Sequence, residues 1–365
     1  MKRGWREALP YYPLLPVGAL IAIVWANTAG ESYFRVAQAL AFPVNDIGVA
    51  FGLASLAQEV LEAIGPGRAL HTWRSALLPI AIAVGGTLGA AASYAAYLHF
   101  TDEQILADGW RIACGVDVFF CVALARVVFS RSPAISVVVL FAVLSDVLAL
   151  LLISQRPFAA GGDAGAVALI FLAVAASTLL RQFDVRSMWP YLIFAGPLAW
   201  IGCYRSGFHP ALALLPIVPF FPRGARTPDD LRGLLHRHAR VAHFETVFAY
   251  PLQAVAFLFG LTNAGVLLQG VDTGTWAVLA ASLVGRPVGI LLAAAAFPKR
   301  SFRWAELIVI AFIGSVGLVF ALFLSTSVFP DGPLLTETKL GAIATVVGGA
   351  IAVGAARVLR VGRFA

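Results

Sequence analysis

The sequence predicts an all-α protein that crosses a membrane many times. Of its 365 residues, 60% are hydrophobic and only 12% are charged, and the mean hydropathy is +0.87. Soluble domains carry about twice that share of charge. Apolar stretches recur from one end of the chain to the other, and no polar stretch is long enough for a separate soluble domain. We therefore expect one integral membrane domain over residues 1–365.

A hydropathy window of about 19 residues predicts about twelve membrane spans. No small-residue cleavage site follows the basic start MKRGWREALPYYP, so the first apolar run is predicted to be a span and not a signal peptide. The eighth predicted span is short and rich in proline (PALALLPIVPFFP). The predicted spans are 12–28, 42–63, 75–99, 109–129, 134–154, 163–182, 188–204, 208–222, 244–269, 274–297, 304–328 and 339–359.

The basic residues alternate between the two ends of these spans. With the amino terminus placed in the cytoplasm, 20 of the 26 Lys and Arg residues fall on the inner side and 5 on the outer side, and Arg286 lies within a span. This bias predicts that both termini are cytoplasmic. The excess of basic residues on the inner side also explains the net charge of +7, so we expect no nucleic-acid partner.

Three charged residues lie deep within predicted spans, where a charge is costly and therefore a functional candidate. Asp117 lies in RIACGVDVFFCV, Asp146 in FAVLSDVLALLLIS and Arg286 in SLVGRPVGILL. Two central acids and one central base are what a cation site with an internal counter-charge needs. The alternative is a salt bridge between helices, but such buried pairs stabilise poorly.

Other polar and small residues in the spans leave more than one interpretation open. Glu59 and Glu62 share one helix face near a cytoplasmic end, which indicates either a funnel that attracts cations or a solvated helix end. Gly115 in span four, and Gly314 and Gly317 in span eleven, indicate interrupted helices of the kind that form ion sites in transporters. Glycine is also common at ordinary helix contacts.

Motifs for enzymatic chemistry do not stand out in the sequence. No Walker motif, catalytic triad, zinc motif or haem pattern is present. The three cysteines lie in apolar surroundings and are predicted to be small core residues. We expect no enzyme activity and no cofactor.

Several collinear segments together resemble one family, the NhaA-type sodium/proton antiporters. The segments are VNDIGVAFGLASLAQEV, LLPIAIAVGG, GWRIACGVD, LSDVLALLLI, YRSGFHPALA, LTNAGVLLQG, VGRPVGI and TKLGAIATVVGG. The resemblance runs nearly end to end and implies inverted repeats, with interrupted helices four and eleven crossing near mid-membrane. It implies a core bundle of roughly 75–154 and 274–359, with 12–63 and 163–269 as the remaining helices. It also implies exchange of Na⁺ or Li⁺ for H⁺ by alternating access, pH homeostasis and a bacterial inner-membrane location.

The resemblance also implies roles for single residues. Asp117 falls on the aspartate of the unwound fourth helix, which is part of the family's cation site. Asp146 falls on the second aspartate of the fifth-helix pair, which is thought to bind sodium and protons alternately. Glu59 matches an acid of the cytoplasmic funnel.

This chain departs from the family pattern at the site itself. Ser145 replaces the first aspartate of the pair, Val116 replaces a threonine and Arg286 replaces a lysine. Arginine does not release its proton in a protein, and serine does not ionise in this range. The family moves two protons against one sodium ion, so we hypothesise that exchange here is electroneutral, with one proton exchanged for one cation at Asp146. Arg286 is then expected to hold Asp117 or to compete with sodium for Asp146.

Two other functions stay open at this point. The chain could be a degenerate member without Na⁺/H⁺ exchange, acting as a sensor or scaffold, or an ion-coupled carrier of another solute. A homodimer is also open: the family dimerises through a hairpin between the first two spans, and VAQALAFP leaves little room for one.

Overall fold

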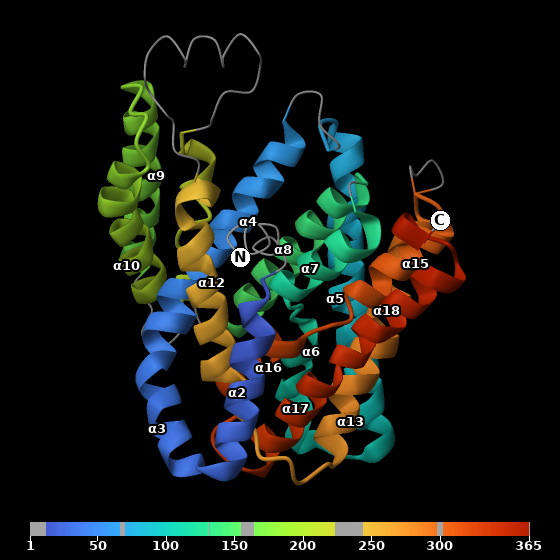
Figure 1. Cartoon of the computed structure of the whole chain (residues 1–365). Helices are drawn as coiled ribbons and strands as arrows, with labels where there is room; N and C mark the ends of the chain where they lie inside the picture. Colours follow the sequence, from blue (N-terminus) through green and yellow to red (C-terminus); the bar gives the residue numbers. More distant parts are fainter. Residues whose placement is uncertain are drawn as a thin grey trace, which may run out of the picture.

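The structure is helical throughout the residues that it describes. The computed structural model describes residues 12–65, 70–130, 132–154, 164–222, 244–297 and 302–364, and no β-strand occurs in these ranges. The α-helices are α2 (Leu14–Thr28), α3 (Gly30–Ala41), α4 (Val49–Ile64), α5 (Trp73–Thr101), α6 (Trp110–Cys114), α7 (Val118–Phe129), α8 (Ala134–Ile153), α9 (Val167–Gln182), α10 (Gly196–Ser206), α12 (Phe244–Asn263), α13 (Thr273–Ala280), α14 (Arg286–Ala295), α15 (Trp304–Ile313), α16 (Leu318–Val328), α17 (Pro333–Ala344) and α18 (Val346–Val358). The all-α prediction is confirmed (Figure 1).

Short π and 3₁₀ segments connect or extend these helices. The π segments are η2 (Phe42–Gly48), η5 (Tyr191–Ala195) and η8 (Ala281–Gly285), and the 3₁₀ segments are η3 (Gln104–Gly109), η4 (Ala164–Ala166), η6 (Pro210–Leu212), η7 (Val218–Phe220) and η9 (Gly362–Phe364). Through η2 and η8 the chain forms the long helical segments Gly30–Ile64 and Thr273–Ala295. π segments are frequent at functional sites, and η8 ends directly before Arg286.

By length and composition, 5 helices in the described ranges can cross a membrane, or up to 7 if each bent pair is one span. The bent pairs are Gln104–Cys114 with Val118–Phe129 and Trp304–Ile313 with Leu318–Val328, and each bends by 48° at its break. The predicted interruption of spans four and eleven is therefore confirmed. α2 and α9 are apolar helices shorter than this measure requires, and the number of about twelve spans stays a prediction.

The prediction of a membrane helix over 208–222 is wrong. Apart from η6 and η7, each of 3 residues, this segment consists of turns. It carries Pro210, Pro216, Pro219 and Pro222. Proline lacks the backbone N–H that a helix requires and clashes with the preceding turn, so the segment packs as irregular backbone.

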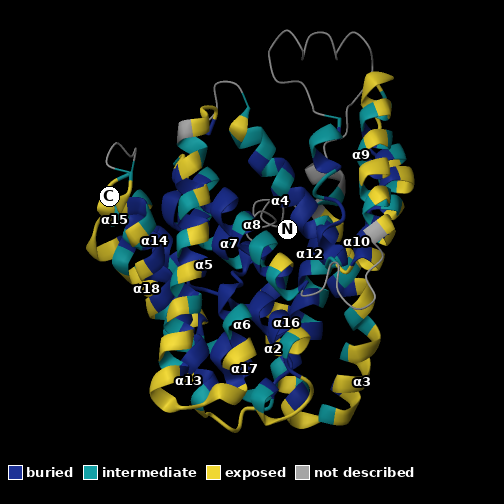
Figure 2. Cartoon of the chain, turned by 180° about the vertical axis from the view of Figure 1, so that it is seen from behind, coloured by how far each residue is buried: buried dark blue, intermediate teal, exposed yellow. Residues whose placement is uncertain are grey.

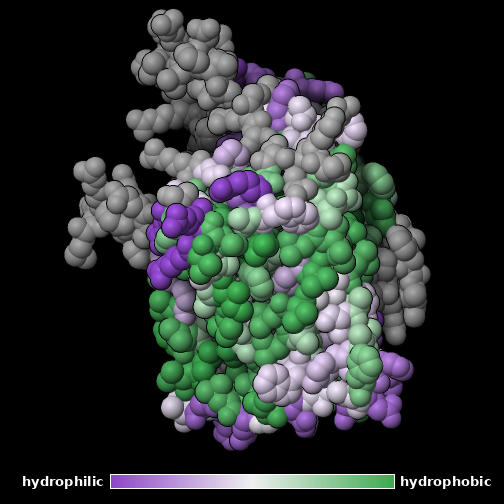
Figure 3. Space-filling model, turned by 90° about the vertical axis from the view of Figure 1, so that its right-hand side faces the viewer, coloured by the Kyte–Doolittle hydropathy of each residue, from purple (hydrophilic) through white to green (hydrophobic). Residues whose placement is uncertain are grey.

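The outward-facing side chains of the helices are mostly apolar. Leu20 is 63% exposed, Phe171 70% and Leu292 68%, and the exposed residues cover the outside of the bundle (Figure 2). In the side view, a hydrophobic band lies between hydrophilic residues at both ends (Figure 3). Helices that expose apolar residues in such a band are suited to lipid, so the protein is a multi-pass membrane protein.

The closest helix contact near Arg286 depends on glycine. A Cβ atom at Gly289 of α14 would lie 2.1 Å from the carbonyl oxygen of Gly85 in α5, and one at Gly85 would lie 2.7 Å from the Gly289 oxygen. Only residues without a Cβ let two membrane helices approach so closely. This contact fixes α14, and therefore Arg286, against α5.

The helices form two groups in space. One contains α5 to α8 and α13 to α18, and the other contains α2 to α4, α9, α10 and α12 (Figure 1). The equal bends of the two interrupted helices agree with the idea of repeats, but the division into inverted repeats stays a prediction. Much of the predicted inner charge lies in 1–11 and 223–243, outside the described residues.

Candidate ion-binding site

The breaks of the two interrupted helices touch each other inside the bundle. The backbone N–H of Asp117 donates to the carbonyl oxygen of Val316 at 2.9 Å, which joins the first break to the second. A Cβ atom at Gly115 would lie 2.3 Å from Leu324 Cδ1, so a larger residue there would push α16 away. Leu318, the first residue of α16, has φ +22°, a strained value for leucine.

Asp117 binds the amino-terminal ends of both helices that follow the breaks. It is 1% exposed, and its Oδ1 accepts a hydrogen bond from the Phe120 N–H of α7 at 3.0 Å. Its Oδ2 accepts from the Val319 N–H of α16, also at 3.0 Å. Helix amino termini carry unpaired N–H groups and partial positive charge, so two of them together favour a negative group at this point.

Asp146 lies beside the first break and is only half satisfied. Its Oδ1 accepts from the Val116 N–H at 3.1 Å, whereas its Oδ2 is buried without a hydrogen-bond partner. The Oγ of Ser145 is also buried without a partner, and both residues are 0% exposed. Buried polar atoms without partners are rare and often mark a place for a ligand or ion.

Arg286 lies in the same core but contacts carbonyl groups. It is 0% exposed, and its Nη2 donates to the carbonyl oxygens of Ala113 and Gly115, the second at 3.2 Å. These carbonyls belong to the carboxyl-terminal end of α6, which carries partial negative charge. Arg286 therefore neutralises one side of the break, as Asp117 neutralises the other.

The expected contact between Arg286 and an aspartate is absent from the described part of the chain. No salt bridge within 4.0 Å joins Arg286 to Asp117 or Asp146, and Nη1 of Arg286 has no hydrogen-bond partner. The expectation that Arg286 holds Asp117 directly is therefore wrong in this geometry. The α6 carbonyls explain why, because they offer the guanidinium acceptors that the sequence does not reveal.

Sequence reasoning missed Thr345, between α17 and α18. Its Oγ1 accepts hydrogen bonds from the N–H groups of Gly317 and Leu318, both at 3.1 Å, and it is 0% exposed. Thr345 and Asp117 together satisfy the amino-terminal end of α16. A lone threonine in an apolar helix gives no signal of this role in the sequence.

The remaining predicted residues lie around this core. Val116 is fully buried and contributes its backbone N–H to Asp146, while its side chain offers no oxygen. Gly314 lies at the end of α15, where a Cβ atom would meet Phe141 at 2.5 Å. Gly317 lies at the second break, where a Cβ atom would lie 3.5 Å from the Gly115 oxygen.

The two acids of α4 lie away from the breaks. Both carboxylate oxygens of Glu59 accept hydrogen bonds from Nη2 of Arg126 in α7, at 2.9 and 2.8 Å. Glu62 is half-buried and has no salt bridge to another described residue. Arg126 therefore neutralises Glu59, whereas an acid that attracts cations would carry a free negative charge.

The chemistry of the site follows from these contacts. Two carboxylates and one hydroxyl are hard oxygen ligands, which suit a small hard cation. The described residues hold no group of three or more His, Cys, Asp or Glu residues that could bind a metal ion. Asp117, Asp146 and Ser145 therefore offer oxygen ligands only, which is the donor type that a hard cation prefers.

The chain is similar to known proteins over most of its length. A model of the family "Na+/H+ antiporter 1" matches residues 13–356. The Na(+)/H(+) antiporter NhaA of Desulfitobacterium hafniense (strain DSM 10664 / DCB-2) is 35% identical over 371 residues, covering 95% of this chain and 93% of that protein. Na(+)/H(+) antiporter NhaA 1 of Pelobacter propionicus is 31% identical over 386 residues, with 100% of both chains covered.

One solved structure has a similar fold. The sodium proton antiporter MjNhaP1 of Methanocaldococcus jannaschii matches with a TM-score of 0.64, covering 96% of this chain and 91% of that one. The sequence identity is 13%, so this match concerns the fold alone.

Proposed function

The chain belongs to the Na+/H+ antiporter 1 family, and from this premise we propose that it exchanges sodium or lithium for protons where its two interrupted helices cross. The observation that carries the proposal is the buried, unpartnered Oδ2 of Asp146; the Oγ of Ser145, the preceding residue, is also buried without a partner. A buried carboxylate oxygen without a donor needs either a proton or a cation.

Asp146 is the group that binds a sodium ion and a proton in turn. Its Oδ1 is held by one N–H and its Oδ2 is available, whereas each oxygen of Asp117 already accepts an N–H from a helix end. Sodium at this point would be bound by Asp146, with Asp117 and the Ser145 hydroxyl as further oxygen ligands. Protonation of Asp146 removes its charge and releases the sodium ion.

The fixed charges around Asp146 favour electroneutral exchange. Asp117 carries one negative charge at two helix amino termini, and Arg286 carries one positive charge at the end of α6. With Asp146 protonated these charges sum to zero, and with Asp146 ionised and bound to sodium they also sum to zero. Because Arg286 does not lose its proton and Ser145 does not ionise, one proton moves against one sodium ion.

The orientation follows from the positive-inside rule. We place both termini in the cytoplasm of a bacterial inner membrane, so that the turn between α2 and α3 and the loop after α12 face outward. Alternating access then exposes Asp146 first to one side and then to the other.

Proton flux in vesicles tests the proposal. Purified protein is reconstituted with a pH-sensitive dye inside the vesicles, and sodium is added on one side. We expect sodium to drive proton movement in the native protein, Asp146→Asn to abolish it, and Ser145→Ala to raise the KM for sodium several-fold, since one neutral ligand is lost. Absence of flux in the native protein, or equal flux in Asp146→Asn, rejects exchange at this site.

The same experiment decides between the alternatives. The departures at Ser145, Val116 and Arg286 favour a degenerate sensor or scaffold as the second candidate, because each removes a group that the family uses. A degenerate protein would give no sodium-driven flux, and sodium would not change its thermal stability. A carrier of another solute would show flux only when that solute is present.

A further inference from the structure

A cavity of about 1030 Å³ opens between the two groups of helices, at the end that carries the loop after α12. We call it the vestibule. Its walls are α3, η2, the end of α12 with the following loop, and the ends of α16 and α17. On the proposed orientation this is the outer face.

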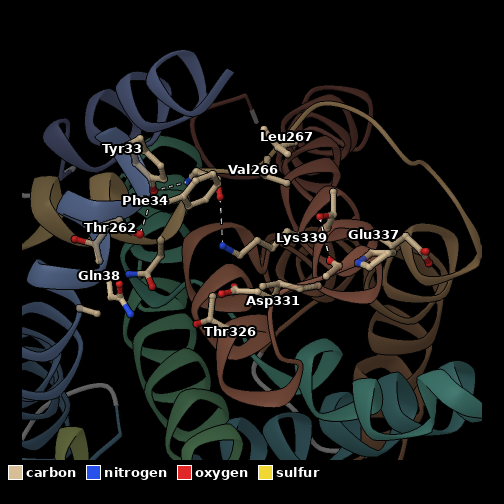
Figure 4. A pocket seen from close by; sticks show the side chains of 18 of the residues that line it. Tyr33, Phe34, Gln38, Thr262, Val266, Leu267, Thr326, Asp331, Glu337 and Lys339 are labelled. Carbon is tan, nitrogen blue, oxygen red and sulfur yellow. Dashed lines mark hydrogen bonds between the residues drawn. The ribbon is translucent and has the colours of Figure 1, made fainter. Parts of the chain in front are cut away.

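Lys339 of α17 lines this vestibule. It is a charged residue only 7% exposed, although it lines a cavity of this size. Its side chain extends from α17 toward the loop after α12, and its Nζ donates to the Gly265 carbonyl oxygen at 3.3 Å (Figure 4). A buried ammonium group has three donors, so one long hydrogen bond satisfies it poorly.

The loop that carries Gly265 is held from its other side by Tyr33 of α3. The Tyr33 hydroxyl accepts from the Gly265 N–H at 2.9 Å and lies 2.9 Å from the Leu261 carbonyl oxygen, to which it donates. The tyrosine ring also packs so closely that a Cβ atom at Gly265 would meet it at 1.9 Å. The loop therefore belongs firmly to the group of α2, α3 and α12.

Lys339 belongs to the other group. α17 packs against α6, α13, α16 and α18, all in the group that contains the crossing. The Lys339–Gly265 hydrogen bond thus bridges the two groups in the lining of the vestibule, and it is one long bond of 3.3 Å. If the two groups move relative to each other, this bond breaks before the Tyr33 contacts do.

The part of the vestibule lining that Lys339 forms is also close to the crossing. Thr345, which binds the amino-terminal end of α16, follows Lys339 by six residues and lies directly after the end of α17. Six residues of α-helix rise about 9 Å. Only a short distance therefore separates the vestibule from the site of Asp117 and Asp146.

We propose that the hydrogen bond between Lys339 and Gly265 is a gate, which closes the route from the vestibule to the crossing and must break before a cation passes on this side. The gate rests on the proposed exchange, but its opening can be measured without transport. Lys339→Met keeps an unbranched side chain, one heavy atom shorter than lysine, and removes the bond. Asp331, which also lines the vestibule, interacts electrostatically with Lys339, so Lys339→Arg, which keeps the charge, is the control for folding.

Cysteine labelling measures the opening directly. Ser325 of α16 is 0% exposed, and its neighbour Thr326 lines the vestibule. A cysteine is placed at each position in turn, and its reaction with a small charged thiol reagent is followed by peptide-resolved mass spectrometry. We expect Lys339→Met to raise the labelling rate of Ser325→Cys about tenfold, as loss of one hydrogen bond to a charged group predicts. Thr326→Cys is the control and should react equally with and without Lys339→Met.

Transport supplies a second measurement, the KM for sodium on each side of the membrane. The gate predicts KM changes of opposite direction on the two sides, which a general structural defect would not produce. A shift of population toward the state open to the vestibule lowers the KM for sodium added on that side and raises it on the opposite side. Lys339→Arg keeps a donor for Gly265 and should restore native behaviour on both sides.

The outcomes separate the two proposals. Equal labelling of Ser325→Cys with and without Lys339→Met overturns the gate, as does a KM that changes in the same direction on both sides. Absence of sodium-driven flux in the native protein rejects the exchange, while the labelling result still decides whether Lys339 closes the vestibule.

Discussion

Replacement of Thr345 by valine tests whether the end of α16 is part of the site. Valine has the shape of threonine but lacks Oγ1, so the N–H groups of Gly317 and Leu318 lose their acceptor in a fully buried place. A buried donor without a partner costs about 1–3 kcal/mol, so the two together predict a loss of about 2–6 kcal/mol in the free energy of unfolding. The freed N–H groups then compete for Asp117, and we expect the KM for sodium to rise about tenfold.

Two assays and one control follow this change. Unfolding in mixed micelles of denaturing and mild detergent gives the stability difference, and sodium-driven proton flux in vesicles gives the KM. Thr345→Ser keeps the oxygen and should stay within about threefold of the native KM. Equal stability and equal KM in Thr345→Val and Thr345→Ser would refute the reasoning.

Three further changes test other parts of the account. Ser145→Asp restores a second carboxylate beside Asp146, and we expect exchange to become sensitive to membrane potential; insensitivity as in the native protein would contradict the charge count. Arg126→Gln breaks the ion pair with Glu59 at 2.8 Å, which is partly exposed, so we expect less than about 1 kcal/mol of lost stability and a small, salt-sensitive fall in sodium KM. Gly289→Ala places a Cβ atom 2.1 Å from a backbone oxygen of α5 and should reduce the yield of folded protein, whereas Gly354→Ala, which meets nothing within 4 Å, should not.

The interrupted helices and their acids could be predicted from the sequence because their signals are local. A carboxylate in an apolar span is costly wherever it occurs, and glycine near it indicates a break. These two rules select Asp117, Asp146, Gly115 and Gly317 without knowledge of their neighbours. The structure brings all four into one region, although their roles in transport stay a proposal.

The partners of Arg286 and Thr345 could not be predicted, because both bind backbone groups far away in the sequence. A carbonyl oxygen left free by a helix break looks the same in the sequence as one within a helix. The prediction of a membrane helix over 208–222 was wrong for a related reason. Its hydropathy is that of a membrane span. Its prolines, however, lack the backbone N–H groups that a helix in lipid needs for its internal hydrogen bonds.

Whether net charge crosses the membrane tests the central claim most directly. Native protein and Asp146→Asn are reconstituted side by side, and current is recorded on a supported membrane while sodium and proton gradients are imposed. Our account predicts sodium-driven proton flux without a transport current in the native protein, and neither flux nor current in Asp146→Asn. A sustained current in the native protein that Asp146→Asn abolishes would contradict one-for-one exchange.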